Sequence, residues 1–372
     1  MKMDRRQVLA GLGLAGAGAG MAGAQPETLP RIAAVPVRPL EAQIARLIIM
    51  GFVGADPQGE GAATMERHLE ERSIGGVLML RHNARERDPA LALAARLRAA
   101  SADAWLAIDQ EGGVVQRLTG DMGFTRIPRA QALAEQGLEA GAALFATAAR
   151  ELAEAGFNLN LAPIADLHDP GNDAIGQYGR AYGGDADSVA AWCAAFIEAF
   201  EAQNIACAIK HFPGHGRSRG DSHDGFVDIT STWSFEEAAP FGQLMRSGHA
   251  HLMMGAHLVN HRLDPDRLPV TLSRRVLHGL LRQVMGYEGA VITDDLDMGA
   301  IRHHYSREEA VIGALKAGND MLLISNSANP DPDLPANIQR WVMAAIERGE
   351  LSQDRITEAN QRLDALETHV RG

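Results

Sequence analysis

Short apolar runs alternate with amphipathic stretches along most of this chain. Pro, Gly and polar residues separate runs of strand length from longer segments in which apolar residues recur with helical spacing. The runs expected to form strands are residues 47–52, 76–80, 104–109, 157–161, 206–210, 251–255, 290–293 and 320–325. The segments expected to form helices are residues 89–100, 139–155, 187–203, 235–246, 273–285 and 307–317, with two more in 337–369.

This alternation predicts an α/β fold, a single (β/α)8 barrel of the TIM type, with allowance for irregular early strands. Periodicity alone does not separate a closed barrel from an open doubly wound sheet, but a count of eight strands favours the barrel. A chain of 372 residues could form one large domain or two smaller ones. Residues 39–372 are expected to be one barrel domain, because no segment remains for a second domain.

Composition and charge narrow the class of partner. The formal net charge of −12 argues against nucleic acid, because phosphate binding needs clustered Lys and Arg. A hydrophobic content of 46% supplies a sizeable core. The two cysteines, Cys193 and Cys207, show no CxxC or His/Cys metal spacing and are expected to be buried free thiols.

The N-terminal residues form a separate segment. Arg5 and Arg6 precede an Ala/Gly/Leu run, and residues 22–24 read AGA, which is typical of a twin-arginine export signal. Residues 1–24 are therefore predicted to be a signal peptide and residues 25–38 a linker, with the mature protein periplasmic or secreted. An uncleaved leader is the alternative. The apolar run is too short and too rich in Gly for a stable membrane span, so none is expected after signal removal.

The densest group of ionisable side chains follows the predicted fifth strand. Residues 210–216 read KHFPGHG, and Asp221 and His223 follow in the same loop. Pro and Gly end the strand, which places Lys210 and His211 at its carboxyl end. Asp221 and His223 are two positions apart, so their side chains share one side of an extended segment. A carboxylate beside an imidazole orients the ring and favours its protonated form, which makes this pair a candidate general acid/base.

Three further polar segments lie elsewhere in the chain, two of them at predicted strand ends. Asp109 and Asp294 end the third and seventh strands, so a barrel would bring them to the same face as Lys210. Asp109 can accept hydrogen bonds from adjacent hydroxyl groups, and Lys and Arg can donate them, which suits a sugar. On chemistry alone, Asp294, Asp295 and Asp297 are rival candidates for a nucleophilic carboxylate. The segments are residues 109–118, DQEGGVVQRL; residues 175–183, IGQYGRAYG; and residues 293–298, TDDLDM.

Taken in order, the four segments resemble the signature of the glycoside hydrolase family 3 β-N-acetylglucosaminidases. The likeness runs from about residue 40 to the C-terminus, with Val114 where Arg is more usual and a slightly expanded loop at residues 175–183. It implies a retaining exo-β-N-acetylglucosaminidase that acts through a covalent aspartyl intermediate. Its partner would be an N-acetylglucosamine-containing saccharide or muropeptide, derived from peptidoglycan or chitin, and it would need no cofactor.

The resemblance also implies roles for single residues. Asp294 would be the nucleophile, His223 the acid/base and Asp221 its orienting partner, while Asp295 would point away toward structural contacts. His215 is expected to be a hydrogen-bonding residue of the loop. From the residues alone, the arginines could instead pair with carboxylates at the barrel rim. The residues implied to bind the terminal sugar are Asp109, Arg117, Arg180, Lys210 and His211.

Two other classes of function remain open. A metal centre could activate water, and His249 and His251 are its best support, although they open the sixth strand at the end opposite the expected site. A non-catalytic sugar-binding protein is disfavoured, because it would not need both Asp294 and His223. No motif specifies the leaving group or whether water or phosphate resolves the intermediate. The imidazoles that could take part in a metal centre are those of His211, His215, His223, His249, His251 and His257.

Overall fold

The computed structural model describes residues 38–220 and 225–372. The predicted signal peptide, the predicted linker up to residue 37, and the predicted pair Asp221 and His223 lie outside the described residues. Within the described ranges, every helix is too short or too polar to cross a membrane.

Eight parallel strands form the centre of the fold, and each overlaps a run that the hydrophobic pattern predicted. They pair in chain order, and β12 pairs back onto β1 with Leu322 opposite Ile48. A bridge between Ile292 and Met321 joins β11 to β12 and completes the ring. The predicted (β/α)8 barrel is confirmed, and its early strands are regular and parallel. The strands are β1 (Ile48–Gly51), β2 (Gly76–Met79), β3 (Trp105–Ile108), β6 (Leu159–Asn160), β7 (Ala206–Phe212), β9 (Leu252–Gly255), β11 (Ala290–Thr293) and β12 (Leu322–Ile324).

Two small sheets accompany the barrel. Strands β4 (Gln110–Gly112) and β5 (Val115–Gln116) form an antiparallel hairpin directly after β3. Strands β8 (Val227–Asp228) and β10 (Leu258–Val259) pair in parallel. Both small sheets follow barrel strands at their carboxyl ends, where they shape the loops around the site.

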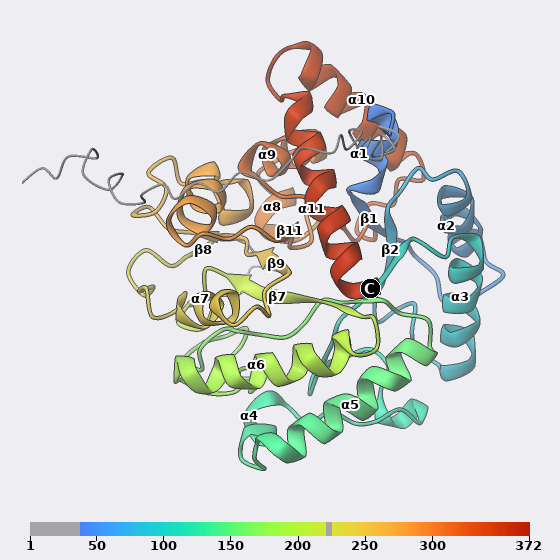
Figure 1. Cartoon of the computed structure of the whole chain (residues 1–372). Coiled ribbons are helices and arrows are strands. Elements are labelled where there is room, and N and C mark those ends of the chain that lie inside the picture. The colour runs from blue at the N-terminus through green and yellow to red at the C-terminus, as the bar shows by residue number, and fades with distance from the viewer. Residues whose placement is uncertain (1–37, 221–224) are drawn as a thin grey trace, which may run out of the picture. The chain divides into compact units, whose positions relative to one another are not determined.

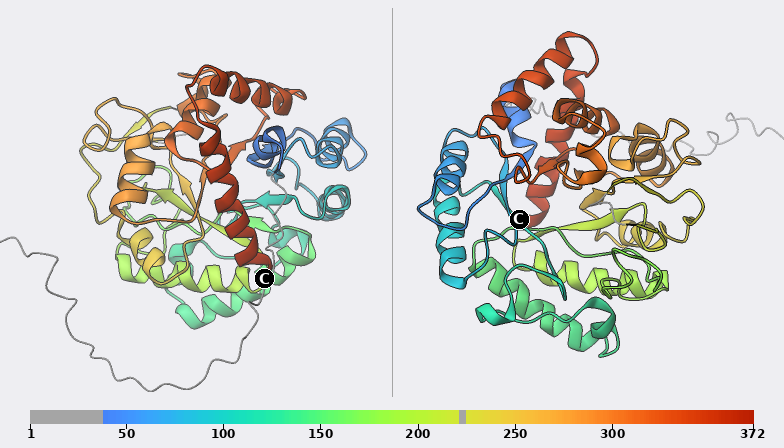
Figure 2. Two further views of the ribbon diagram at one scale, coloured as in Figure 1. Left: turned by 45° about the horizontal axis from the view of Figure 1, so that its top comes forward. Right: turned by 180° about the vertical axis from the view of Figure 1, so that it is seen from behind.

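The helices lie around the outside of the strands (Figure 1, Figure 2). All the predicted helices are present, and α1, α2, α4 and α8 are additional. Ser306 begins α9 with a capping box, in which its side chain and that of Glu309 each bond the other residue's backbone N–H. The helices are α1 (Leu40–Arg46), α2 (Glu60–Glu70), α3 (Arg87–Ala100), α4 (Ala130–Ala134), α5 (Leu138–Glu154), α6 (Ala186–Glu201), α7 (Ala239–Arg246), α8 (Gly299–Arg302), α9 (Arg307–Ala317), α10 (Leu334–Glu347) and α11 (Gln353–Arg371), with 3-10 turns η1 (Gly120–Met122) and η2 (Val270–Leu272) and the π-helix η3 (Arg275–Val284).

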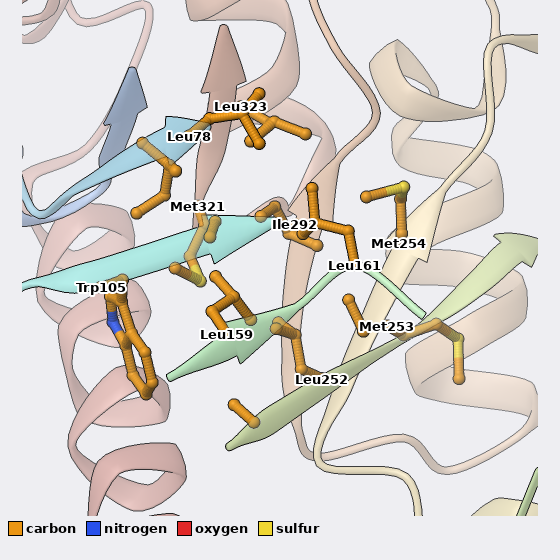
Figure 3. Close-up of a cluster of buried hydrophobic side chains, with 14 of the residues drawn as sticks. Leu78, Trp105, Leu159, Leu161, Leu252, Met253, Met254, Ile292, Met321 and Leu323 are labelled. Atoms are coloured by element: carbon orange, nitrogen blue, oxygen red, sulfur yellow. The ribbon is translucent and has the colours of Figure 1, made fainter. Parts of the chain in front are cut away.

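Apolar side chains fill the barrel interior in layers (Figure 3). Leu78, Leu161, Met254 and Leu323 come from the second, fourth, sixth and eighth strands, Leu161 directly after its strand, and all four line one cavity. A layer built from alternate strands is the usual packing inside such barrels. Because these four side chains belong to the even-numbered strands, the odd-numbered strands are left to supply the next layer toward the carboxyl ends.

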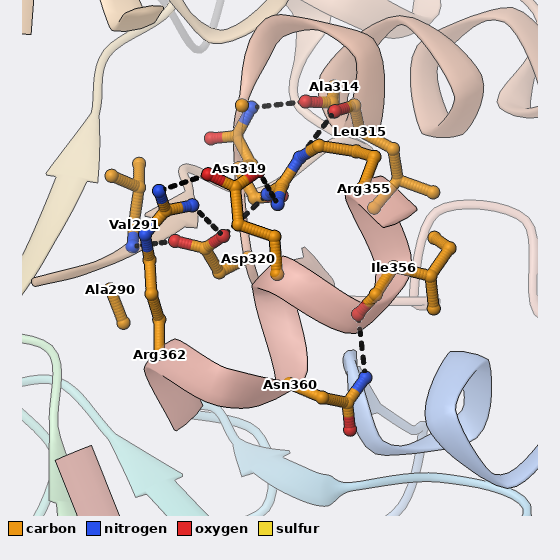
Figure 4. Close-up of polar contacts among 12 residues, drawn as sticks. Ala290, Val291, Ala314, Leu315, Asn319, Asp320, Arg355, Ile356, Asn360 and Arg362 are labelled. Carbon is orange, nitrogen blue, oxygen red and sulfur yellow. Dashed lines mark hydrogen bonds and ion pairs between the residues drawn. The ribbon is translucent and has the colours of Figure 1, made fainter. Parts of the chain in front are cut away.

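Helix α11 packs across the amino ends of the strands. Asp320, two residues before β12, is fully buried and forms ion pairs with Arg282, Arg355 and Arg362. Arg355 and Arg362 belong to α11 and are labelled in Figure 4. Arg371 of α11 lies over the ring of Trp105 at the start of β3. A buried carboxylate that lost these partners would be strongly destabilising, so the network fixes α11 to the base of the barrel.

Cys193 of α6 and Cys207 of β7 are both buried and free, as predicted. Burial raises the pKa of each thiol well above its usual range, which keeps both thiols protonated and unreactive.

Candidate active site

Polar side chains from three odd-numbered strands gather above the apolar layer. Asp109 directly follows β3, Lys210 lies near the end of β7, and Asp294 directly follows β11. They line a cavity of about 290 Å³ together with Arg117, Arg180 and His211. The structure therefore brings together, at the carboxyl ends of the strands, all six predicted site residues that it describes.

Lys210 links two carboxylates at the wall of this cavity. Its Nζ lies 3.0 Å from Asp109 Oδ1 and 2.7 Å from Glu111 Oε1. Arg117 approaches the other oxygen of Asp109, with 3.0 Å between Nη2 and Oδ2. Asp109 is thus held by cations on both oxygens, which fixes the orientation that a carboxylate needs to accept hydrogen bonds from a sugar.

Arg180 holds the second carboxylate of the group. Its Nε and Nη2 lie 3.0 and 2.8 Å from the two oxygens of Glu111, and its Nη1 donates to the Ala174 carbonyl at 3.0 Å. The expanded loop therefore still directs Arg180 into the cavity. The expectation that Arg117 and Arg180 pair with rim carboxylates is also met, because both arginines do so while they line the cavity.

The electrostatics of this group keep its members charged. Burial alone would raise the pKa of Asp109, but the charges of Lys210 and Arg117 outweigh it and hold that pKa well below its usual range. The pKa of Glu111 is likewise lowered, because Arg180 and Lys210 outweigh its burial. Three cations face two carboxylates, so the group carries one excess positive charge beside the cavity.

His211 is oriented by a carboxylate from the neighbouring strand. Asp166, fully buried after β6, accepts from His211 Nδ1 at 2.7 Å and from the backbone N–H of His215 at 2.8 Å. Burial would raise the pKa of Asp166, but His211 and His215 lower it. An imidazole held through Nδ1 presents its Nε2 edge, and His211 lines the cavity.

The three carboxylates of residues 294–297 have different partners. Asp295 Oδ1 accepts the N–H groups of Asp297 and Ser325 at 3.0 and 2.8 Å, so it makes structural contacts as expected, although it also borders the cavity. Both oxygens of Asp297 are bound by Arg307. Asp294 accepts only the Asp295 N–H, at 2.8 Å, among the described hydrogen bonds.

The ionisation of these neighbours differs as well. Burial raises the pKa of Asp294, but His257 and His211 outweigh it and the net pKa is below its usual range. Burial raises the pKa of Asp295 to about 6. At neutral pH, Asp294 is therefore an ionised carboxylate with an oxygen available to the cavity, which is the state a nucleophile requires.

The loop after His211 is anchored before it reaches the predicted acid/base. His215 is buried, its Nδ1 lies 2.6 Å from Ser218 Oγ, and Asn172 Nδ2 donates to the His215 carbonyl at 2.8 Å. The Gly220 N–H donates to Asp173 Oδ2 at 2.7 Å. His215 is thus the hydrogen-bonding loop residue that the sequence predicted, and burial lowers its pKa to about 4.

The histidines named for a metal centre divide between two ends of the barrel. His211 and His215 lie beside the cavity, and His257 bonds Thr271 Oγ1 and the Asp295 carbonyl. His249 and His251 lie before β9 at the opposite end. In the described parts of the chain, the one group of three side chains close enough to hold an ion is at that opposite end and comprises Glu201, His251 and His369.

Sequence reasoning did not assign Glu111, Asp166 or Asn172. Glu111 stands inside the segment DQEGG, and its place two residues after Asp109 was a signal. Asp166 lies six residues after the fourth strand, in the segment that follows its carboxyl end, so its position was a weaker signal than that of Asp109. Asn172 gave no such signal, because its contacts with the loop at 215–218 are long-range.

The chain is similar to known glycosidases along most of its length. Residues 39–366 match the glycosyl hydrolase family 3 N terminal domain. A β-hexosaminidase of Pseudomonas aeruginosa strain LESB58 is 34% identical over 268 residues, which cover 69% of this chain and 77% of that protein. The structure of a family 3 β-N-acetylglucosaminidase from Paenibacillus sp. str. FPU-7 matches with TM-score 0.80 and 32% identity, over 90% of this chain and 63% of that one. A β-N-acetylhexosaminidase structure from Beutenbergia cavernae DSM 12333 matches with TM-score 0.79 and 28% identity, over 89% of this chain and 99% of that one.

The fold and the cavity define a barrel enzyme whose site combines the ionised carboxylate of Asp294 with a group of charged hydrogen-bonding side chains. This chain belongs to glycoside hydrolase family 3 and is a glycosidase of the β-hexosaminidase type. The resemblance drawn from the four sequence segments is confirmed.

Proposed function

We propose that this enzyme is a retaining exo-β-N-acetylglucosaminidase that releases terminal N-acetylglucosamine from peptidoglycan- or chitin-derived β-glycosides. The observation that carries the proposal is the single cavity in which Asp294 lies with Asp109, Arg117, Lys210 and His211. Retention requires one carboxylate to attack the anomeric carbon and a separate acid to protonate the leaving oxygen.

Asp294 is the proposed nucleophile. It is ionised, it lies at a strand end that holds its position, and it retains an oxygen that can reach the cavity. Asp297 is disfavoured for this role because Arg307 occupies both of its oxygens. Asp295 is disfavoured because backbone N–H groups hold it and its pKa of about 6 leaves it partly protonated near neutral pH.

The proposed sugar-binding groups are Asp109, Arg117, Lys210, His211 and Arg180. Asp109 accepts from sugar hydroxyls, while the cations that orient it can donate to neighbouring oxygens. The cavity of about 290 Å³ lies at the lower limit of small-molecule sites, roughly 300–1,000 Å³. A space of that size suits one sugar unit, which supports removal of a terminal residue.

His223 is the proposed acid/base and Asp221 its orienting partner. Both lie outside the described residues, and the proposal rests on their spacing and on the family resemblance. The loop before Asp221 supports this assignment. The Gly220 N–H donates to Asp173, which holds the chain beside the segment that carries Arg180.

Substrate selectivity tests this function. Purified enzyme should cleave an aryl β-glycoside that carries a 2-acetamido group far faster than the same glycoside with a 2-hydroxyl group. Equal rates, or cleavage of the 2-hydroxyl compound alone, would contradict the proposed substrate class. Activity retained after extensive chelation is expected, whereas loss of activity on metal removal would favour the metal-dependent alternative.

We further propose export by the twin-arginine route, on the strength of Arg5, Arg6 and the AGA sequence at residues 22–24. The mature chain should begin near Gln25 outside the cytoplasm, and replacement of both arginines by lysine should trap the precursor inside. N-terminal sequencing that finds Met1 on periplasmic protein would contradict cleavage.

A further inference from the structure

Three side chains from distant parts of the chain meet at the amino ends of the barrel strands, opposite the cavity. Glu201 is the last residue of α6, His251 directly precedes β9, and His369 lies in the last turn of α11. One possible ligand atom from each lies within 4.8 Å of the others. His251 belongs to the sequence pair that the proposed glycosidase chemistry does not use.

The contacts within this cluster are close. His369 Nε2 lies 3.0 Å from Glu201 Oε2, and the rings of His251 and His369 stack with 3.4 Å between centroids and 22° between planes. Neutral imidazoles and a carboxylate are all possible ligands of one cation, and a shared cation would use the three side chains together.

His251 carries the clearest sign of a missing partner. Its Nε2 is buried and has no hydrogen-bond partner in the described part of the chain. Most buried polar atoms have a partner, so a ligand on Nε2 accounts for an otherwise unexplained atom.

The chemistry of the donors selects the ion. Two imidazole nitrogens and one carboxylate oxygen suit Zn²⁺ better than Mg²⁺ or Ca²⁺, which prefer oxygen ligands. Tetrahedral Zn²⁺ with bonds of about 2.0–2.2 Å needs ligand atoms roughly 3.4 Å apart. The Glu201–His369 contact is already near this value, and the His369 side chain is 41% exposed on the last turn of α11, so it has room to adjust.

We propose that Glu201, His251 and His369 form a zinc site that fastens the end of α11 to the base of the barrel. The fourth position would be taken by water, because His369 faces solvent. A metal that binds the folded chain but not the unfolded chain stabilises the fold by mass action. The site would therefore be structural, and the hydrolysis at the other end of the barrel would not depend on it.

The test uses untagged protein, freed of metal by chelation, and compares the original chain with His369→Asn. Because His369 is exposed, this variant should fold as the original chain does, and His249→Asn is the matched control. His249 lies two residues before His251 but pairs with Glu198, at 3.0 Å, outside the cluster. Zinc stoichiometry, thermal unfolding with and without Zn²⁺, and Co²⁺ absorption are measured for all three proteins.

We expect the original chain and His249→Asn to bind one more zinc ion than His369→Asn. At free zinc about 100 times Kd, their Tm should rise by about 4 °C relative to metal-free protein. The tetrahedral Co²⁺ spectrum should be absent from His369→Asn, while its glycosidase activity should be unchanged. Equal zinc stoichiometry and equal Tm shifts in all three proteins would overturn the proposal, as would loss of zinc binding in His249→Asn but not in His369→Asn.

Discussion

The substitution Asp166→Asn tests whether Asp166 orients His211 for catalysis in addition to stabilising the fold. Asp166 is fully buried and accepts the ring N–H of His211 and two backbone N–H groups, those of His211 and His215. An asparagine oxygen can still accept from the backbone, but its NH₂ group would face His211 Nδ1 and donate to it. The substitution thus removes one charge-assisted hydrogen bond and forces the opposite tautomer on the His211 ring.

The expected magnitudes follow from that single contact. A hydrogen bond to a charged group contributes about 1.5–3 kcal/mol, which for a chain of this size lowers Tm by about 2–4 °C. If His211 must keep its orientation for productive binding, the same free energy lowers kcat/KM by roughly 10- to 150-fold. Because His211 and His215 depress the pKa of Asp166, the lost stability is present above pH about 4 and disappears as pH falls through the folded-state pKa.

The assay measures kcat/KM on an aryl N-acetylglucosaminide and the free energy of unfolding in urea, each over a pH series. Asp264→Asn is the control, because Asp264 is a buried carboxylate that bonds Ser273 and does not line the cavity. It should lose stability without losing kcat/KM. If Asp166→Asn loses stability but keeps full kcat/KM, the proposed role of Asp166 in orienting His211 is wrong.

Four further substitutions test other parts of the structure. Asp294→Ala should abolish turnover in a folded protein, whereas Asp295→Ala should keep activity but unfold about 1–3 kcal/mol more easily, because two backbone N–H groups lose their acceptor. His223→Ala should slow substrates with poor leaving groups far more than activated aryl glycosides, as stopped-flow rates across a leaving-group series would show. Glu237→Gln should gain stability relative to the original chain by up to about 3 kcal/mol as pH rises from about 4.5 to 7, measured by urea unfolding.

The sign of the Glu237 effect follows from its environment. Burial and the nearby Asp166 raise its pKa to about 7, although Arg217 and backbone hydrogen bonds oppose them. The protonated form is therefore favoured by folding, and that stability is lost as pH rises through the folded-state pKa. Glu236→Gln is the control, since Glu236 is exposed and should show no such pH dependence. A pH-independent difference for Glu237→Gln, an active Asp294→Ala, or an equal loss for every leaving group on His223→Ala would each refute the matching assignment.

The barrel could be predicted because each strand is marked within its own sequence. Runs such as 206–210 and 290–293 are apolar and bounded by turn residues, and the count of eight then selects a closed ring. Some short elements were not predicted, because they contain too few residues for a pattern to be recognised within their own sequence. Helices α1 (Leu40–Arg46) and α8 (Gly299–Arg302) are too short to show a helical period, and tertiary packing holds them.

The site was predictable where residues stand at strand ends and not where partners come from elsewhere. Asp109, Lys210 and Asp294 are strand-end residues, and the fold brings them together. The pairing of Arg180 with Glu111 joins a loop to strand β4, and the two residues are 69 positions apart. The cluster of Glu201, His251 and His369 joins residues from three separate parts of the chain. Of these three residues, the sequence indicated only His251 as a possible metal ligand. Local sequence patterns carry no information about contacts between residues that are far apart in the chain.

Trapping of the covalent intermediate tests the central claim most directly. The enzyme is incubated with the 5-fluoro analogue of N-acetylglucosaminyl fluoride, which forms the glycosyl-enzyme faster than it is released, and the labelled peptide is sequenced by mass spectrometry. We predict one sugar per chain, attached to Asp294. A label on Asp295 or Asp297, or turnover of the natural anomer with inversion and no label, would contradict the account.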